Sequence, residues 1–493
     1  MPEHDTAQRA TSEKARPVFV PDFSTEHRRP LILAAAVLAS SMGFIDGTVV
    51  SIAIPAIRST LGATLDQATW INNAYMVALS ALILTGGAFG DRFGLARVFS
   101  LGVGLFLLTS LACALAPTPD TLIAARLAQG VGASLMIPGA LAMISRAYPR
   151  DVRGRAIGMW AAASGLTTAA GPLIGGLILS TFGEDAWRYI FAINLPLGII
   201  ALVLVRRGVV KDARRSGEPI DALGAALAVA GLGLLAWTLT HLEASNDIRI
   251  TIVTGIAGVI ALTAFILHEG RTPQPMMPLR LFANPAFSAA NLATFLLYFG
   301  MSAILFFLPM LTVVGWGLSE FKTIFAFGPL SGFIALLSTR FGRLADRRGP
   351  GPVIAVGACV VAIGYAVLAL VVDGRDFWFG VLPAMGIVGF GMSMVVAPLS
   401  TAVMVAAGDG QSGIASGINN AISRIGGLTA VAAMSSVATI AYNLSGGPAS
   451  FGERAAGDAH TAAMGSAFAA IVWVAAGFAA IAALAAAYGI RRR

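Results

Sequence analysis

The chain is a succession of long apolar runs separated by short polar connections. A helix of about 20 residues, rising 1.5 Å per residue, crosses the hydrocarbon core of a bilayer. Runs of that length lie at residues 31–55, 70–90, 97–116, 121–144, 153–181, 187–206, 221–241, 249–268, 286–314, 322–340, 352–372, 377–404, 412–440 and 463–490. The pattern therefore predicts an all-α polytopic membrane protein with fourteen transmembrane helices.

The polar segments outside the runs predict the domain boundaries. Residues 1–30 are polar and lack the apolar centre of a signal peptide, so we expect a disordered tail. A basic linker separates the sixth run from the seventh. The expected domains are a six-helix bundle at 31–206, the linker at 207–220, two helices at 221–268 and a second six-helix bundle at 286–490.

An internal repeat supports this division. GAFGDRFG at 87–94 and GRLADRRG at 342–349 share Gly, Asp, Arg and Gly at the same spacing, and they follow the second and the tenth run. Two six-helix halves in direct succession would place the copies six helices apart, whereas these are eight apart. The repeat therefore predicts two helices inserted between the halves, and many secondary transporters are built from such repeated halves.

The distribution of Lys and Arg predicts the orientation. Most basic residues fall in the tail, at the C-terminus and in every second connection. The other connections hold only Arg58, Arg188, Arg249, Lys322, Arg375 and Arg454. By the positive-inside rule both termini are expected in the cytoplasm, and the membrane is expected to be a bacterial inner membrane.

Composition narrows the class of protein. Hydrophobic residues make up 57% of the 493 residues and charged residues 12%, whereas soluble proteins carry about 25% charged residues. The net charge of +8 is attributed to cytoplasmic loops and not to nucleic-acid binding. Cys113 and Cys359 are isolated in apolar runs. We find no metal-ligand cluster, nucleotide-binding loop or catalytic triad, so neither an enzyme nor a metal or ATP requirement is expected.

Asp46 lies in the middle of the first run. A carboxylate near the centre of a membrane helix costs at least roughly 2.5–3.5 kcal/mol, so it should face a partner, a cavity or a proton. Arg126, in the fourth run, lies at a depth that differs by roughly 6 Å, which an arginine side chain can bridge. Asp46 could then carry a proton, with Arg126 holding it ionised when close and allowing protonation when moved away. The alternative is a static ion pair that joins two helices.

Several motifs resemble one family. FIDGTVVSIAIP at 44–55 resembles the first-helix motif of the fourteen-helix drug:proton antiporter family of the major facilitator superfamily, and residues 87–94 resemble the superfamily signature between helices 2 and 3. Arg126 with residues 129–132 resembles the fourth-helix motif, and WRYIFAINLPLG at 187–198 opens the sixth helix as in this family. The resemblance implies a major facilitator fold and proton-driven multidrug efflux.

Two further sets of residues acquire roles from this resemblance. The repeated loops are interpreted as conformational latches, with plain charged turns as the alternative; their residues are Gly87, Asp91, Arg92, Gly94, Gly342, Asp346, Arg347 and Gly349. A ridge in the fifth run resembles the antiporter motif and is interpreted as a hinge that discourages leak, with ordinary helix packing as the alternative. Its residues are Gly158, Gly171, Pro172, Gly175 and Gly176.

Polar and aromatic residues in several runs are candidates for lining a substrate cavity, although each alone more often forms an interhelical hydrogen bond. They are Asn72, Asn73, Tyr75, Gln129, Asn291, Tyr298, Asn419 and Asn420. Arg424, in the thirteenth run, lacks an obvious intramembrane acid. It is expected near the cytoplasmic surface or at an anionic lipid head group.

The prediction is a proton-coupled antiporter that exports hydrophobic compounds, monovalent cationic or neutral, by alternating access. Its partners would be the substrate, protons and membrane lipids, without any cofactor beyond the coupling proton. The alternatives are an exporter of an endogenous lipid, siderophore or metabolite, a proton-coupled importer, and a membrane scaffold or sensor without flux. The sequence does not indicate whether a periplasmic adaptor is recruited.

Overall fold

The computed structural model describes residues 23–212, 221–240, 248–273, 275–407, 412–455 and 457–490, and in these ranges the regular elements are helices. In the first half they are α2 (Arg29–Leu61), α3 (Leu65–Phe93), α4 (Leu95–Ala114), α5 (Pro119–Ala147), α6 (Arg150–Phe182), α7 (Trp187–Ala192) and α8 (Asn194–Gly208). They continue with α9 (Ala222–Thr240), α10 (Ile248–Arg271), α11 (Pro285–Pro309), α12 (Glu320–Ile324), α13 (Gly328–Arg348), α14 (Pro350–Val371), α15 (Leu382–Ala407), α16 (Ser412–Leu444) and α17 (Asp458–Gly489).

Each predicted run coincides with one helix or with two consecutive ones. Twelve helical segments of the described residues are long and apolar enough to cross a membrane. The helices α3 and α6 are not among these twelve, so the count of fourteen crossings stays a prediction. The protein is thus an all-helical multi-pass membrane protein.

Short-range sequence signals account for several helix ends. Thr64 precedes α3 and Thr118 precedes α5, and each accepts a hydrogen bond from the backbone N–H three residues later, in a capping box. The sixth run is broken between α7 and α8, where Pro196 falls in the first turn of α8. A proline is tolerated there because the first N–H groups of a helix have no partner within the helix.

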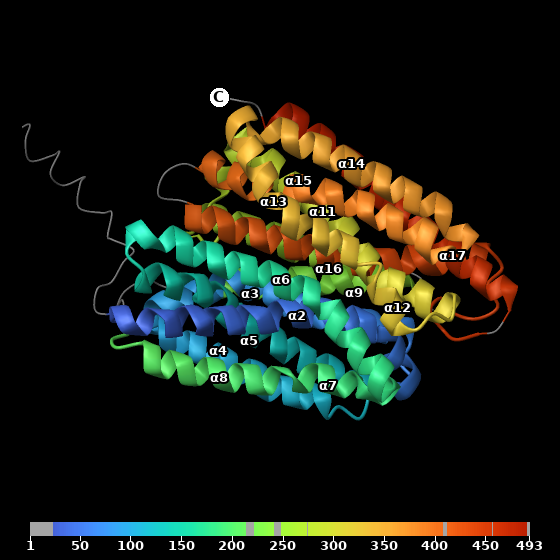
Figure 1. Ribbon diagram of the computed structural model, residues 1–493, viewed down its shortest axis with the longest axis horizontal. Coiled ribbons are helices and arrows are strands. Elements are labelled where there is room, and N and C mark those ends of the chain that lie inside the picture. Colours follow the sequence, from blue (N-terminus) through green and yellow to red (C-terminus); the bar gives the residue numbers. More distant parts are fainter. Residues whose placement is uncertain are drawn as a thin grey trace, which may run out of the picture.

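The helices are arranged in two halves with α9 beside them (Figure 1). In that view α2–α8 lie in the lower part and α11 and α13–α17 in the upper part, with α12 at the right where the two parts meet. The inserted helix α9 packs on α3 and α16 together, through an apolar cluster that includes Val77, Ala228 and Leu428. It therefore lies along the seam between the halves. The other inserted helix, α10, contacts α9 and exposes apolar side chains such as Ile256 and Ile260 on its outer face.

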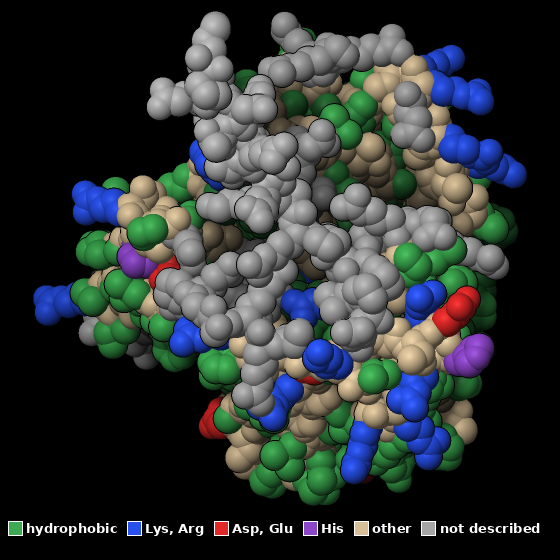
Figure 2. All heavy atoms as spheres, turned by 90° about the vertical axis from the view of Figure 1, so that its left-hand side faces the viewer, with side chains coloured by type: hydrophobic (Ala, Val, Ile, Leu, Met, Phe, Trp, Pro, Cys, Tyr) green, Lys and Arg blue, Asp and Glu red, His purple; other side chains and the backbone are tan. Residues whose placement is uncertain are grey.

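The long helices begin and end at two opposite ends of the molecule. The start of α2 and the end of α17 lie toward the left of Figure 1. Figure 2 shows this end, with Lys and Arg side chains around its rim and few Asp or Glu. We call it the basic end and refer to the other as the opposite end.

The N-terminal tail prediction requires a correction. Residues 1–22 lie outside the described part of the structure, and the described residues begin at Phe23. The backbone N–H of Val210 donates to the Phe23 carbonyl at 2.9 Å, and Ser24 Oγ donates to the Gly208 carbonyl at 2.8 Å. These contacts pair the start of α2 with the chain that follows α8, so the last residues assigned to a disordered tail are structured.

Candidate functional site

The structure brings Asp46 and Arg126 together. Asp46 lies in the middle of α2 and Arg126 in the first third of α5. They form an ion pair between Asp46 Oδ2 and Arg126 Nη1. Both side chains are 0% exposed. The two helices run in opposite directions, so residues far from each other in sequence reach the same depth, as their positions in the runs had indicated.

Three polar side chains complete the surroundings of the Asp46 carboxylate. The Gln129 amide nitrogen donates to Asp46 Oδ1 at 3.1 Å and to Ser110 Oγ at 2.8 Å, while the Gln129 amide oxygen accepts from Arg126 Nη1 at 2.6 Å. The Asn194 amide nitrogen lies 3.5 Å from Asp46 Oδ1 and 3.3 Å from Ser110 Oγ. Donors from α5 and α8 therefore surround a carboxylate on α2.

Aromatic rings and a backbone carbonyl hold the arginine in place. The Arg126 guanidinium carbon lies 4.3 Å from the centre of the Tyr75 ring and 5.7 Å from that of Phe191. Arg126 Nε donates to the Ile71 carbonyl at 3.0 Å. A cation over an aromatic face gains about 0.5–2 kcal/mol, more when water is excluded. The guanidinium is thus fixed from α3 and α7 as well as by Asp46.

This arrangement has a definite chemical consequence. Taking one partner away from a buried ion pair leaves an uncompensated charge, at a cost of about 3–5 kcal/mol. A proton on Asp46 would remove that charge and let Arg126 leave without the penalty. The site is therefore suited to exchanging an arginine contact for a proton.

The predicted cavity residues separate into different surroundings. Tyr75 and Gln129 belong to the Asp46 cluster, whereas Asn419 donates to Asn291 Oδ1 at 3.1 Å and to Thr294 Oγ1 at 2.6 Å in the other half. Among the remaining candidates, Asn73 is 0% exposed, and its side-chain oxygen accepts a hydrogen bond from the Asn72 amide nitrogen. Tyr298 and Asn420 are partly exposed.

The repeated loops share one backbone conformation. Gly94 is both the last cap of α3 and the first cap of α4, with φ of 102°, and Gly349 does the same between α13 and α14 with φ of 87°. L-residues with a side chain rarely adopt these angles, so glycine is required at both positions. The side chains of Asp91 and Asp346 lie outside the described part of the structure, so the latch role stays a prediction.

One latch loop is held from the linker. Asp212, which follows α8, accepts a hydrogen bond from the backbone N–H of Arg97 at 3.0 Å, in the first turn of α4. The same carboxylate lies against Gly94, where an added Cβ would come within 2.7 Å of it. A carboxylate at a helix N-terminus is stabilising. The start of the linker is therefore fastened to the loop between α3 and α4.

The glycine ridge of α6 makes close contacts on two sides. A Cβ at Gly171 would lie 2.1 Å from Thr48 Oγ1 of α2, and one at Gly176 would lie 2.1 Å from Ile324 Cδ1 of α12. Gly176 thus lies where the first half of the molecule contacts the second. The surroundings of Gly158 and Pro172 are outside the described residues, and the hinge role is not tested by these contacts.

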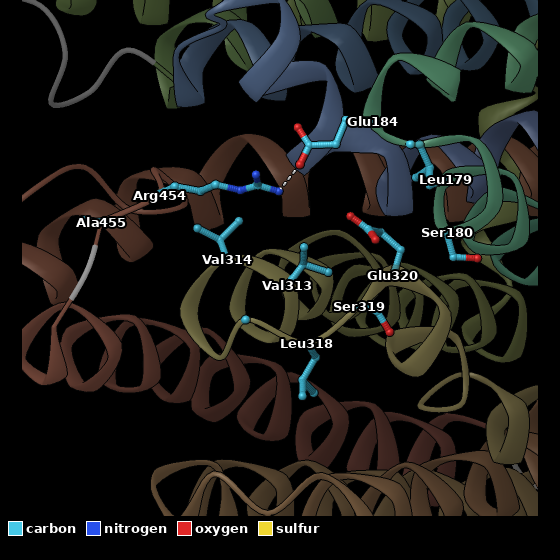
Figure 3. A pocket seen from close by; sticks show the side chains of 12 residues that line it. Leu179, Ser180, Glu184, Val313, Val314, Leu318, Ser319, Glu320, Arg454 and Ala455 are labelled. Atoms are coloured by element: carbon cyan, nitrogen blue, oxygen red, sulfur yellow. Dashed lines mark ion pairs between the residues drawn. The ribbon is translucent and has the colours of Figure 1, made fainter.

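A pocket of about 720 Å³ lies between the halves at the opposite end. Figure 3 shows the ion pair at its edge, between Glu184, which follows α6, and Arg454, which precedes α17. Ser59 Oγ donates to the same Glu184 carboxylate. Nearby, Arg58 Nη1 donates to the Phe451 carbonyl at 3.1 Å. The two halves are thus joined at this end by polar contacts as well as by Gly176.

Sequence reasoning missed several of these residues. Asn194 lies in the WRYIFAINLPLG motif at 187–198, and its position as a polar residue in an apolar run could have drawn attention to it. Ser110 gave no such signal, because serine is common in membrane helices. Arg454 was counted only as a loop charge and Glu184 was not noted, since nothing in the sequence pairs two connections so far apart.

Comparison with known proteins identifies the family. The model of the Major Facilitator Superfamily matches residues 36–431. The chain belongs to this superfamily. It is therefore a membrane transporter.

Named relatives include resistance proteins. The methylenomycin A resistance protein of Streptomyces coelicolor is 30% identical over 413 residues, which cover 83% of this chain and 86% of that protein. The tetracenomycin C resistance and export protein of Streptomyces glaucescens is 32% identical over 409 residues, which cover 81% of this chain and 73% of the relative. This transporter is thus similar to proteins of drug resistance and export.

A solved structure shares the fold. A bacterial homologue of the human lysosomal transporter Spinster, in an inward-facing and unoccupied conformation, aligns with a TM-score of 0.68 and 17% identity, covering 95% of this chain and 99% of that one. The likeness extends over nearly the whole chain and concerns the fold alone.

Proposed function

We propose that this transporter is a proton-coupled antiporter that exports small hydrophobic compounds by alternating access between two six-helix halves, with α9 and α10 as inserted helices. It would act in a bacterial inner membrane with both termini, and hence the basic end, in the cytoplasm. The resistance and export proteins among its relatives support export as the direction.

The observation that carries this proposal is the fully buried Asp46 carboxylate, paired with Arg126 and bonded by Gln129. An ionisable residue inside a membrane protein is by default a functional group, because its burial is costly. The Asp46 carboxyl group has two favourable states: ionised and paired with Arg126, or protonated and unpaired. A coupling residue needs two such states.

Contacts between the halves at the opposite end support an assignment of the state. They include Gly176 and the Glu184–Arg454 pair. If that end faces outward, the closed outer side accompanies an ion-paired Asp46, as expected after a proton has been released inward. In the outward-open state a proton would then replace Arg126 on Asp46, and its release on the cytoplasmic side would restore the pair.

The driving force sets what such exchange can achieve. One charge crossing a potential of 100 mV is worth about 2.3 kcal/mol. One proton entering per neutral molecule expelled therefore supports roughly a fifty-fold gradient from the potential alone. A one-for-one exchange with a monovalent cation would be electroneutral and would draw only on the pH difference.

The substrate is left open by the site of proton coupling. The sequence favours a monovalent cationic or neutral compound, with an endogenous lipid, siderophore or metabolite as the second candidate. Export of either class would use the same coupling residues, so Asp46 does not distinguish between the two classes of substrate.

Proton flux in proteoliposomes tests the proposal. With a pH gradient imposed, we expect ethidium or a neutral or acidic hydrophobic solute to trigger proton movement in the wild type and not in Asp46→Asn. The matched control is Asp120→Asn, which removes an exposed carboxylate at the start of α5 and should leave the flux unchanged. Substrate-triggered flux that survives in Asp46→Asn would reduce Asp46 to a structural partner of Arg126.

A further inference from the structure

Arg424 is a charged residue in a membrane helix that the proton-coupling site does not use. It lies on α16, ten residues beyond Ile414, where the membrane-spanning part of this helix begins. At 1.5 Å per residue that is about 15 Å along the helix from Ile414. The expected position of Arg424, near the cytoplasmic surface or at a lipid head group, stays a prediction.

The packing of α16 brings Arg424 between the halves. Two glycines follow it after Ile425, and the first of them, Gly426, lies against the Phe295 carbonyl of α11, where an added Cβ would come within 2.7 Å. A Cβ on Gly427 would lie 2.8 Å from Ser302 Oγ and 3.2 Å from Met76 Cε of α3. Because α16 approaches both neighbours so closely, Arg424 is placed at the junction of α3, α11 and α16.

The surroundings of Arg424 contain hydroxyl groups and no described acid. The groups with which it interacts electrostatically are Tyr75 of α3 and Tyr298 of α11. Its Nε is buried and has no hydrogen-bond partner among the described residues, while the side chain as a whole is part-exposed. This is unlike Arg126, whose charge is balanced by Asp46.

The charge balance across this region is therefore positive. Asp46 and Arg126 neutralise each other, and Tyr75, which stacks on Arg126, also lies within electrostatic range of Arg424. An arginine in a desolvated site requires an anionic or strongly accepting partner, which its planar fork binds through two parallel hydrogen bonds. The same charge repels a cation.

We propose that Arg424 binds an acidic group, a carboxylate or a phosphate, on the transported solute, at the junction of α3, α11 and α16. This rests on the proposed function and replaces the cationic or neutral substrate with an acidic hydrophobic one. Exchange of one proton inward for one monoanion outward moves two charges per cycle. At 100 mV each charge is worth about a fifty-fold gradient, so such export would depend steeply on the membrane potential.

Equilibrium binding tests this without requiring transport. Naphthalene-2-carboxylate, naphthalene-2-carboxamide and 2-naphthylmethylammonium differ in charge on one ring system. We expect the wild type in phosphatidylcholine nanodiscs to prefer the carboxylate. Replacing Arg424 by glutamine should weaken carboxylate binding roughly 10- to 100-fold and leave the carboxamide unchanged, because a hydrogen bond to a charged group is lost.

Two further variants guard the conclusion. Arg424→Lys keeps the charge and should recover part of the carboxylate preference, which a merely unfolded protein would not do. Arg375→Gln removes an exposed arginine at the opposite end and should bind all three compounds as the wild type does. No preference of the wild type for the carboxylate, or an equal loss of all three compounds in Arg424→Gln, overturns the proposal.

The source of the anionic group and the coupling are tested separately. Phosphatidylglycerol added to the nanodiscs should leave carboxylate binding unchanged; if it displaces the carboxylate in the wild type and not in Arg424→Gln, a lipid head group is the natural occupant and the proposal fails. The carboxylate preference should persist in Asp46→Asn. If proton coupling through Asp46 fails while the carboxylate preference is kept, only the proposed function is overturned. If the carboxylate preference is absent while coupling is kept, only the proposal for Arg424 is overturned.

Discussion

Two ion pairs join segments of this transporter that are distant in sequence, and they lie in opposite surroundings. The Asp46–Arg126 pair is inside the first half, with both side chains 0% exposed. The Glu184–Arg454 pair links the two halves at the opposite end, where the side chains are 34% and 52% exposed. The chemistry is the same, a carboxylate and a guanidinium, so the difference in burial decides what each pair can do.

Burial makes one pair costly to open and the other easy. Water takes over the charges of an exposed pair when it separates, so such pairs contribute only about 0–1 kcal/mol. A buried pair that loses a partner keeps an uncompensated charge. We therefore expect the exposed Glu184–Arg454 pair to open and close as the halves move. The buried Asp46–Arg126 pair should separate only when a proton takes the place of the arginine.

The largest expected effect is at the buried pair. Arg126→Leu leaves Asp46 without its cation and should destabilise the protein by about 3–5 kcal/mol. Adding Asp46→Asn should recover most of that loss, because the isolated charge is then gone. Unfolding in mixed micelles measures both variants, and additive losses would mean that the two residues are not coupled in stability.

An intermediate effect is expected from the packing beside the exposed pair. A valine at Gly176 would overlap Ile324 and the Glu320 carbonyl, where even a Cβ comes within 2.1 Å and 3.0 Å. Overpacking of this kind costs typically about 1–3 kcal/mol, so the opposite end should stay open more of the time. Distances between spin labels on α6 and α12 report the opening.

The matched control for this change is Gly47→Val on α2, where a Cβ would meet nothing within 4 Å. It should leave the spin-label distances as they are in the wild type. If both variants open the end equally, the effect comes from valine in a helix and not from the contact between the halves.

The smallest effect is expected at the exposed pair itself. Glu184→Gln should change the free energy of unfolding by less than about 1 kcal/mol, and added salt should reduce the difference further. The same variant should still shift the spin-label distances toward the open state. Asp458→Asn breaks the exposed pair with Arg375, which lies within one half, and serves as the control that should leave the distances unchanged.

The helices were largely predictable because their signals are local. Hydropathy marked each apolar run, whereas the capping threonines at 64 and 118 were recognised only in the structure. The repeat at Gly94 and Gly349 was visible as well, since a left-handed backbone angle between two abutting helices requires glycine in each copy. The ordered start of the chain was not predicted, because its partners Gly208 and Val210 come from the other side of α8.

The candidate site was predictable in its principal pair and not in its surroundings. A charge in an apolar run draws notice wherever it lies, so Asp46 and Arg126 were found. Which neutral side chains would bond to them depends on how α4, α5 and α8 are rotated, and this left Ser110 and Asn194 unrecognised. The proximity of Arg424 to Tyr75 and Tyr298 was not predicted for a related reason, because these tyrosines belong to other helices.

The sequence by itself determined where the chain is apolar, where it carries buried charge and where its backbone needs glycine, because each of these depends on a residue and its near neighbours. The tertiary structure alone decided which buried charge is balanced and which is not. Asp46 balances Arg126 across two helices, while the described titratable groups within electrostatic range of Arg424 are Tyr75 and Tyr298. Charges interact through space, and the distances between helices exist only once the helices have packed.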